Sequence, residues 1–162
     1  MIGPEVYKLS SISANGFSVT CPKGTNRFSG DAASKKLKLY VAVGGGEPVY
    51  VGVTKQPIQR RLYLGWKAKG ANGYHGYAWR HHLQNVDLML WYHDAAVTVS
   101  DVETIEAEVA FLIRKAGQWP RFQTEIHFHP STPFHREIAE QIYADILANN
   151  RHPFLANQSE IS

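Results

Sequence analysis

Residues 37–66 read LKLYVAVGGGEPVYVGVTKQPIQRRLYLGW. Apolar residues alternate through Leu37–Val43, and Val49–Val53 has the same β-branched character, so both segments are predicted to be short strands. The intervening Gly44–Pro48 is a strong turn signal because it combines successive glycines with a proline. The stretch therefore predicts an antiparallel hairpin joined by a five-residue loop.

Hydrophobic periodicity on both sides of the hairpin predicts the other elements. The predicted helices are Gln56–Trp66, Asp101–Lys115 and Pro133–Asn149, and the further strands are Phe17–Cys21, Leu88–Tyr92 and Thr124–His129. Ser100 is expected to cap the second helix. We expect an α/β fold of the α+β type, with a small three-stranded antiparallel sheet flanked by helices. Residues 1–36 would form an N-terminal arm, 37–129 the central domain, and 130–162 a C-terminal helix and tail packed on it.

Composition sets broad limits on function. The chain has 162 residues, a net charge of +3 and eight histidines, which suits one globular domain and permits a nucleic-acid partner. Cys21 is the single cysteine, so no intrachain disulfide can form. No signal-peptide or membrane-spanning run is recognisable, and we therefore expect a cytoplasmic protein with no membrane contact.

The hairpin resembles the paired signature of the GIY-YIG nuclease superfamily. Lys38-Leu39-Tyr40 matches the first half of that signature, and Val49-Tyr50-Val51-Gly52 matches the second half. The helical arginine and the metal-binding glutamate of the superfamily then correspond to Arg60 and Glu108. The neighbouring Arg61 is a less favoured match for the arginine, because it lies one step further round the helix. Glu103 and Glu106 are equally charged rivals of Glu108. Pro120 resembles a later proline of the superfamily.

The resemblance implies an endonuclease that hydrolyses phosphodiester bonds with one bound Mg²⁺ or Mn²⁺. Tyr40 would take a proton from the attacking water, provided that a nearby cation lowers its pKa, and Tyr50 would hold the water or the phosphate. Arg60 would bind two phosphate oxygens with its planar fork. Glu108 would be the metal ligand, since Mg²⁺ prefers oxygen ligands and keeps several waters. DNA is the expected substrate, with RNA as the less favoured one.

Three positions depart from the superfamily pattern. Lys38 replaces the opening glycine and is expected to be exposed on its strand. Leu64 stands where many members have a histidine or tyrosine, so Tyr63 or a histidine of the following loop would have to substitute. Gln123 is the nearest amide to a position that is often asparagine.

Residues 67–82 interleave glycine, aromatic and basic residues, a mixture that suits either phosphate and base contacts or the covering of a core. A restriction-type enzyme would need a homodimer to cut both strands, and Pro133–Asn149 is the candidate interface. The candidate nucleic-acid contacts are Lys67, Lys69, Tyr74, His75, Arg80 and Gln123.

Three alternatives remain open at this point. The chain could be a binding module of the same fold that has lost catalysis, which Leu64 and Gln123 favour. It could be an unrelated metal hydrolase built on His75, His127 and His129, although a His-x-His pair without a third ligand at fixed spacing is a weak metal signal. It could also be a purely structural or interaction protein.

Overall fold

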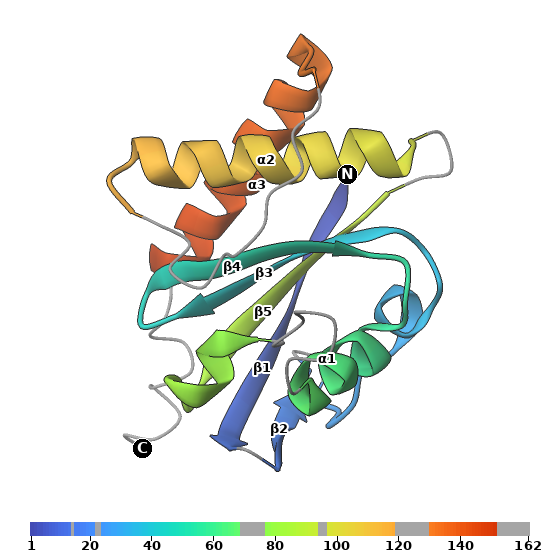
Figure 1. Ribbon diagram of the computed structural model, residues 1–162, viewed down its shortest axis with the longest axis vertical. Coiled ribbons are helices and arrows are strands. Elements are labelled where there is room, and N and C mark those ends of the chain that lie inside the picture. The colour runs from blue at the N-terminus through green and yellow to red at the C-terminus, as the bar shows by residue number, and fades with distance from the viewer. Residues whose placement is uncertain (14, 22–23, 69–76, 94–96, 119–129, 152–162) are drawn as a thin grey trace.

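A single antiparallel sheet runs through the molecule, with helices on both of its faces (Figure 1). The computed structural model describes residues 1–13, 15–21, 24–68, 77–93, 97–118 and 130–151. The strand order is β2-β1-β5-β3-β4. The strands are β1 (Ile2–Ser13), β2 (Gly16–Thr20), β3 (Lys38–Gly44), β4 (Glu47–Thr54) and β5 (Val86–Tyr92).

Three α-helices cover the sheet within the described residues, namely α1 (Ile58–Lys67), α2 (Val99–Lys115) and α3 (Pro133–Arg151). Helices α2 and α3 pack on one face and on each other, while α1 lies on the opposite face together with a short 3₁₀ helix, Ala78–His81 (Figure 1). The α+β class expected from the sequence is thus confirmed, and the predicted helices differ from the observed ones only at their ends. The predicted strand Thr124–His129 lies outside the described residues.

The expected three-stranded sheet is wrong, because the sheet has five strands. The N-terminal residues supply the two additional ones: β1 pairs with β5 along Glu5–Leu9, and β2 pairs with β1. Strand β1 is therefore an interior strand of the sheet. Its core residues, Tyr7 and Leu9, alternate with exposed Lys8, as expected for a strand with one buried face.

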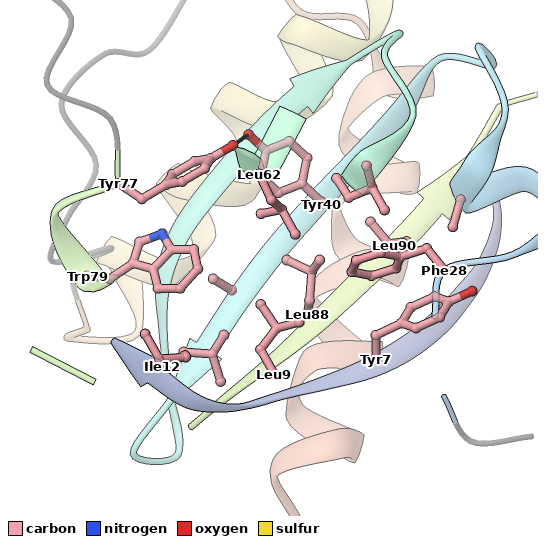
Figure 2. Close-up of a cluster of buried hydrophobic side chains, with 14 of the residues drawn as sticks. Tyr7, Leu9, Ile12, Phe28, Tyr40, Leu62, Tyr77, Trp79, Leu88 and Leu90 are labelled. Atoms are coloured by element: carbon pink, nitrogen blue, oxygen red, sulfur yellow. Dashed lines mark hydrogen bonds between the residues drawn. The ribbon is translucent and has the colours of Figure 1, made fainter. Parts of the chain in front are cut away.

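Alternation along the strands divides the core into two parts. On β3, Leu39, Val41 and Val43 face α2 and α3, whereas Tyr40 and Ala42 face α1. Because successive side chains of a strand point to opposite faces, the single strand β3 contributes to both cores. Figure 2 shows the α1 side, where the labelled aromatic and aliphatic side chains form one continuous cluster.

The hairpin turn between β3 and β4 is shorter than the five residues expected. The strands continue to Gly44 and Glu47, which leaves only Gly45 and Gly46 in the turn. Both have positive φ, 63° and 78°, the combination of a type I′ turn that favours glycine. This tight turn, with one register shift between Ala42 and Val43, sets which residues of the two strands lie opposite each other.

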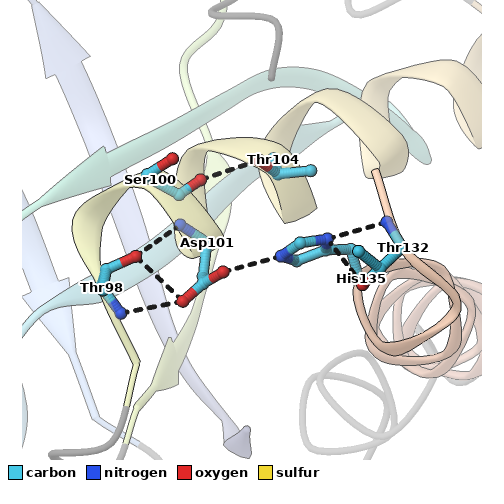
Figure 3. Close-up of polar contacts among 6 residues, drawn as sticks. All are labelled: Thr98, Ser100, Asp101, Thr104, Thr132 and His135. Atoms are coloured by element: carbon cyan, nitrogen blue, oxygen red, sulfur yellow. Dashed lines mark hydrogen bonds and ion pairs between the residues drawn. The ribbon is translucent and has the colours of Figure 1, made fainter. Parts of the chain in front are cut away.

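The start of α2 is tied to the start of α3 by a polar network (Figure 3). Thr98, not the expected Ser100, is the N-cap: Thr98 Oγ1 accepts from the Asp101 N–H at 3.1 Å, and the Thr98 N–H donates to Asp101 Oδ2 at 3.1 Å. His135 Nδ1 accepts from the Thr132 N–H at 3.0 Å, so its Nε2 carries the proton that it donates to Asp101 Oδ1 at 2.8 Å. The Asp101 carboxylate therefore joins two helix N-termini.

Asp101→Asn is expected to lower the free energy of unfolding at pH 6 by about 1 kcal/mol, the scale of a charge-assisted hydrogen bond at a partly exposed site. The hydrogen bond with His135, and then those with Thr98, lower the pKa of Asp101 to about 2 from 3.8. Since the folded pKa is depressed, this stabilisation is present above about pH 4 and is lost as the pH falls toward 2. Urea denaturation at pH 6, 4 and 3 should show the difference from the parent narrowing, while Ser100→Ala should stay close to the parent at pH 6.

Helix α3 uses its apolar face within the chain. Ala139, Ile142 and Ile146 are buried against α2 and the sheet. The exposed side of α3 includes Phe134, and self-association through 133–149 stays a prediction. Of the helices in the described part of the chain, none has both the length and the apolar character needed to span a bilayer.

Candidate active site

Tyr40 and Tyr50 lie on the same face of the β3–β4 hairpin. Tyr40 is directly opposite Gly52, and Tyr50 is directly opposite Ala42, so the side chains of Tyr40, Ala42 and Tyr50 share the face that α1 covers. The two phenol rings stack with their centroids 5.8 Å apart. The strand register thus places both tyrosine side chains on one face of the sheet, as the roles expected from the sequence require.

Gly52 makes this stacking geometrically feasible. A Cβ at position 52 would lie 2.5 Å from Tyr40 Cζ and 2.8 Å from Tyr50 Cε1, closer than real Cβ atoms come to other atoms. The two tyrosine rings therefore occupy the space above a residue without a side chain. The close packing of the two rings therefore explains why position 52 is occupied by glycine.

Tyr77, which immediately precedes the 3₁₀ helix Ala78–His81, is the third tyrosine of this cluster. Its hydroxyl lies 3.0 Å from the Tyr40 hydroxyl (Figure 2). Its ring meets that of Tyr50 edge-on at 5.3 Å. Space for its ring comes from Gly65 on α1, where a Cβ would overlap the Tyr77 ring. The sequence placed Tyr77 only in a mixed aromatic and basic loop, and no spacing rule pointed to its position beside Tyr40.

The arginine beside these tyrosines is Arg61, not Arg60. The Arg61 guanidinium lies 5.0 Å from the centre of the Tyr77 ring, and its positive charge acts on both Tyr40 and Tyr50. Arg60 is exposed, and no interaction within the described residues joins it to the tyrosines. Successive helix residues are rotated by about 100°, so the burial of Ile58 and Leu62 directs Arg61 to the site and Arg60 to solvent.

Glu106 of α2 is a glutamate whose charge acts on one tyrosine of this cluster. Its side chain is only 6% exposed, and its negative charge acts on Tyr50. Glu108, the glutamate named from the sequence, is partly exposed, and no interaction among the described residues connects it with Tyr40 or Tyr50. Two residues along a helix correspond to a rotation of about 200°, so the two glutamates cannot share a face.

Burial raises the pKa of Tyr40 well above its ordinary value of 10.0, and it also raises the pKa of Tyr50. The Arg61 charge opposes this change at both tyrosines, but the burial of the hydroxyls outweighs it. The lowered pKa that the sequence-based hypothesis required is therefore not provided by the arginine. At neutral pH both hydroxyls are protonated and can donate hydrogen bonds.

Lys38 is buried, which corrects the expectation that it would be exposed. Its Nζ donates to three peptide carbonyls, those of Ser34, Lys36 and Gln56, at 2.7, 2.7 and 2.9 Å. Burial lowers its pKa to about 8 from 10.5. The ammonium group thus joins the start of β3 to the segments before it and before α1, and it has no donor left for a substrate.

The other predicted contacts have different surroundings. Lys67 is exposed, and its ammonium lies 4.4 Å from the centre of the Tyr63 ring. Arg80 donates to the carbonyls of Gly65 and Ala68 at the end of α1, so its guanidinium is used within the fold and we no longer count it as a nucleic-acid contact. Leu64 is 37% exposed. Predicted residues that lie outside the described part of the chain are Lys69, Tyr74, His75, Gln123, His127 and His129.

A hard divalent cation is compatible with the oxygen atoms of this cluster. Glu106 carries a carboxylate whose charge acts on Tyr50, and Mg²⁺ is commonly bound through one or two carboxylates together with water and substrate phosphate. Within the residues that the structure describes, no group of three or more His, Cys, Asp or Glu side chains could enclose a metal by itself. An ion here would therefore depend on water and on the substrate for its remaining ligands.

Comparisons of the chain with protein-family models, with curated proteins and with solved structures find no match. The fold and the site thus define the class only as an α+β protein with one antiparallel sheet. Its distinguishing feature is a tyrosine cluster beside an arginine, with a buried glutamate whose charge acts on one of the tyrosines. The resemblance to the GIY-YIG superfamily stays a prediction from the sequence.

Proposed function

We propose that this chain is a metal-dependent endonuclease that hydrolyses phosphodiester bonds in DNA by a GIY-YIG-type mechanism. One observation carries the proposal: Tyr40, Tyr50 and Tyr77, from three separate segments, gather beside Arg61, and the Glu106 charge acts on Tyr50. Phosphodiester hydrolysis needs a positioned water, a cation on the phosphoryl oxygens and help for the leaving oxygen. The cluster contains a group suited to each of these tasks.

The exposures of the tyrosines suggest a division of roles. Tyr40 is 1% exposed and is hydrogen-bonded to Tyr77, whereas Tyr50 is the partly exposed member of the three. We therefore assign the contact with the attacking water to Tyr50, with Tyr40 and Tyr77 as positioning residues beneath it. Tyr50 thus keeps the contact with water that the resemblance implied, whereas Tyr40 changes from the proton acceptor to a positioning residue.

Arg61 is assigned to the phosphate. Its planar guanidinium can donate to two phosphoryl oxygens, and it lies beside rather than within the aromatic core. Glu106 is assigned to the cation, Mg²⁺ or Mn²⁺. A bound ion there would supply positive charge for the leaving oxygen and would favour the ionised form of a neighbouring hydroxyl.

The direct test is cleavage of supercoiled plasmid DNA by the purified chain. We expect nicking or discrete fragments with Mg²⁺ or Mn²⁺. We expect EDTA to abolish cleavage, because the proposed mechanism assigns the charge on the leaving oxygen to the bound cation. Gel electrophoresis with single-stranded DNA and RNA in parallel would rank the substrates. An uncut plasmid together with salt-sensitive DNA binding would instead favour a binding module of the same fold.

A further inference from the structure

A pocket lies beside the tyrosine cluster, between the β1–β2 turn and the outward face of α1. Its volume is about 460 Å³, within the range of about 300–1,000 Å³ for small-ligand sites. The side chains that line it are those of Asn15, Phe17, Gln59, Tyr63, Trp66 and Lys67. None of these residues belongs to the hydrolytic site described above.

One face of α1 provides most of the lining. Gln59 and Tyr63 are four residues apart, Tyr63 and Trp66 are three apart, and Lys67 follows at four from Tyr63, so these side chains are neighbours on the helix surface. Ile58, Leu62 and Gly65 are the buried residues of the same helix. The pocket therefore occupies the side of α1 that packing against the sheet leaves available.

The back wall of the pocket is held in place by contacts with the N-terminal hairpin. Trp66 Nε1 donates to the Ser13 carbonyl at 2.9 Å, and the Trp66 ring packs on the Phe17 ring with a centroid distance of 4.6 Å. Strand β2 and α1, distant in sequence, lie side by side (Figure 1). The wall is thus formed before any ligand binds.

The pocket combines three kinds of group that recognise a nucleotide. Tyr63 is 50% exposed, an unusual position for a large aromatic ring, and it offers a surface on which a base can stack. The side-chain amides of Asn15 and Gln59 make no hydrogen bond within the described residues, so their donors and acceptors can meet a base edge. The Lys67 ammonium beside the Tyr63 ring can meet a phosphate.

The pocket also adjoins the proposed hydrolytic site. The Trp66 ring contacts that of Tyr77 with centroids 6.3 Å apart, and Tyr77 in turn contacts Tyr50 at 5.3 Å. We propose that this pocket binds an unpaired nucleobase of the nucleic-acid substrate, close to the phosphodiester that Arg61 receives. The identity of the ligand rests on the proposed function. If the pocket binds such a base, the chain selects substrates that have a base outside the duplex stack.

Binding measured in EDTA separates this assignment from catalysis. The probes are two DNA duplexes that carry one 2-aminopurine, unpaired in the first and paired in the second. We expect the parent to bind the unpaired duplex more tightly and to quench its fluorescence by stacking. Tyr63→Ala should weaken binding of the unpaired duplex by about 5- to 150-fold, the range for removal of one base–aromatic stack, while Tyr63→Phe should keep most of the affinity.

Phe111→Ala is the matched control, because Phe111 is 57% exposed on α2 and lies outside the pocket. Equal affinity of Tyr63→Ala and the parent for the unpaired duplex would overturn the pocket assignment, even if the chain cuts DNA when metal is added. Tyr63-dependent binding by a chain that does not cut would support the pocket and count against the nuclease. A parent that binds neither duplex would overturn both.

Discussion

Glu106→Gln is expected to reduce metal-dependent DNA cleavage by about a thousandfold, whereas Glu108→Gln should leave the rate within about twofold of the parent. The amide of glutamine keeps the shape of the side chain but removes the negative charge that a hard cation requires. Glu106 is buried and its charge acts on Tyr50, while Glu108 is partly exposed and has no such contact in the described structure. The two variants therefore separate two carboxylates that sequence spacing treats as nearly equivalent.

The measurement is the initial rate of plasmid nicking as a function of Mg²⁺ concentration, with circular dichroism to show that each variant is folded. A loss caused by failed metal binding should be partly recovered at high Mg²⁺ or with Mn²⁺. Equal rates for Glu106→Gln and the parent would remove Glu106 from the site. A large loss of cleavage rate in Glu108→Gln alone would show that Glu108 is the metal ligand, as the resemblance implies.

The hairpin that carries the tyrosines was predictable because its signals are local. Alternating apolar residues specify the strands, and successive glycines specify the turn between them. The shared face of Tyr40 and Tyr50 was not predictable, since it depends on the register shift between Ala42 and Val43. The two-residue turn at Gly45 and Gly46 alone would place Tyr40 opposite Val51 and Tyr50 on the other face of the sheet. A change of one residue in register reverses which face a side chain occupies.

The two N-terminal strands show why the extent of the sheet was underestimated. Residues 1–36 are rich in turn signals, and the pairing that gives β1 its place joins Leu9 to Val86, far along the chain. Such pairing leaves no spacing pattern in a single sequence. Burial of Tyr7 and Leu9 across from β5 is what makes β1 part of the core, and it becomes visible only once the chain is folded.

Within a turn of the helical arginine and glutamate named from the sequence, the structure has Arg61 and Glu106, whose charges act on the tyrosines. Spacing from Tyr50 selects Arg60, but the rotation of α1 is set by the burial of Ile58 and Leu62, which brings Arg61 to the tyrosines. Tyr77 had no usable signal at all, because its position depends on the absence of a side chain at Gly65. Tertiary packing thus determined the phase, as it generally does when neighbouring residues have the same chemistry.

Arg61→Ala is expected to lower the rate of DNA cleavage by about 10²–10³-fold, the usual cost of removing one preorganised group from a developing negative charge. Arg60→Ala, its neighbour in sequence, should change the rate by less than about threefold, since the Arg60 side chain is exposed. Both variants remove one positive charge from the same helix, so a general weakening of DNA attraction would affect them equally. The contrast between them therefore isolates the position of the guanidinium.

Arg61→Lys adds a test of geometry, because lysine retains the charge but lacks the planar fork that donates to two phosphate oxygens. We expect it to lie between the parent and Arg61→Ala when single-turnover rates are measured at saturating protein. The cation–aromatic contact with Tyr77 contributes about 0.5–1 kcal/mol, and circular dichroism should show that all three variants are folded. If Arg60→Ala proved the slower of the two alanine variants, Arg60 would be the arginine that binds the phosphate, as its spacing from Tyr50 predicts. If both alanine variants cut as fast as the parent, neither arginine would bind the scissile phosphate, and the site would have to be sought away from α1.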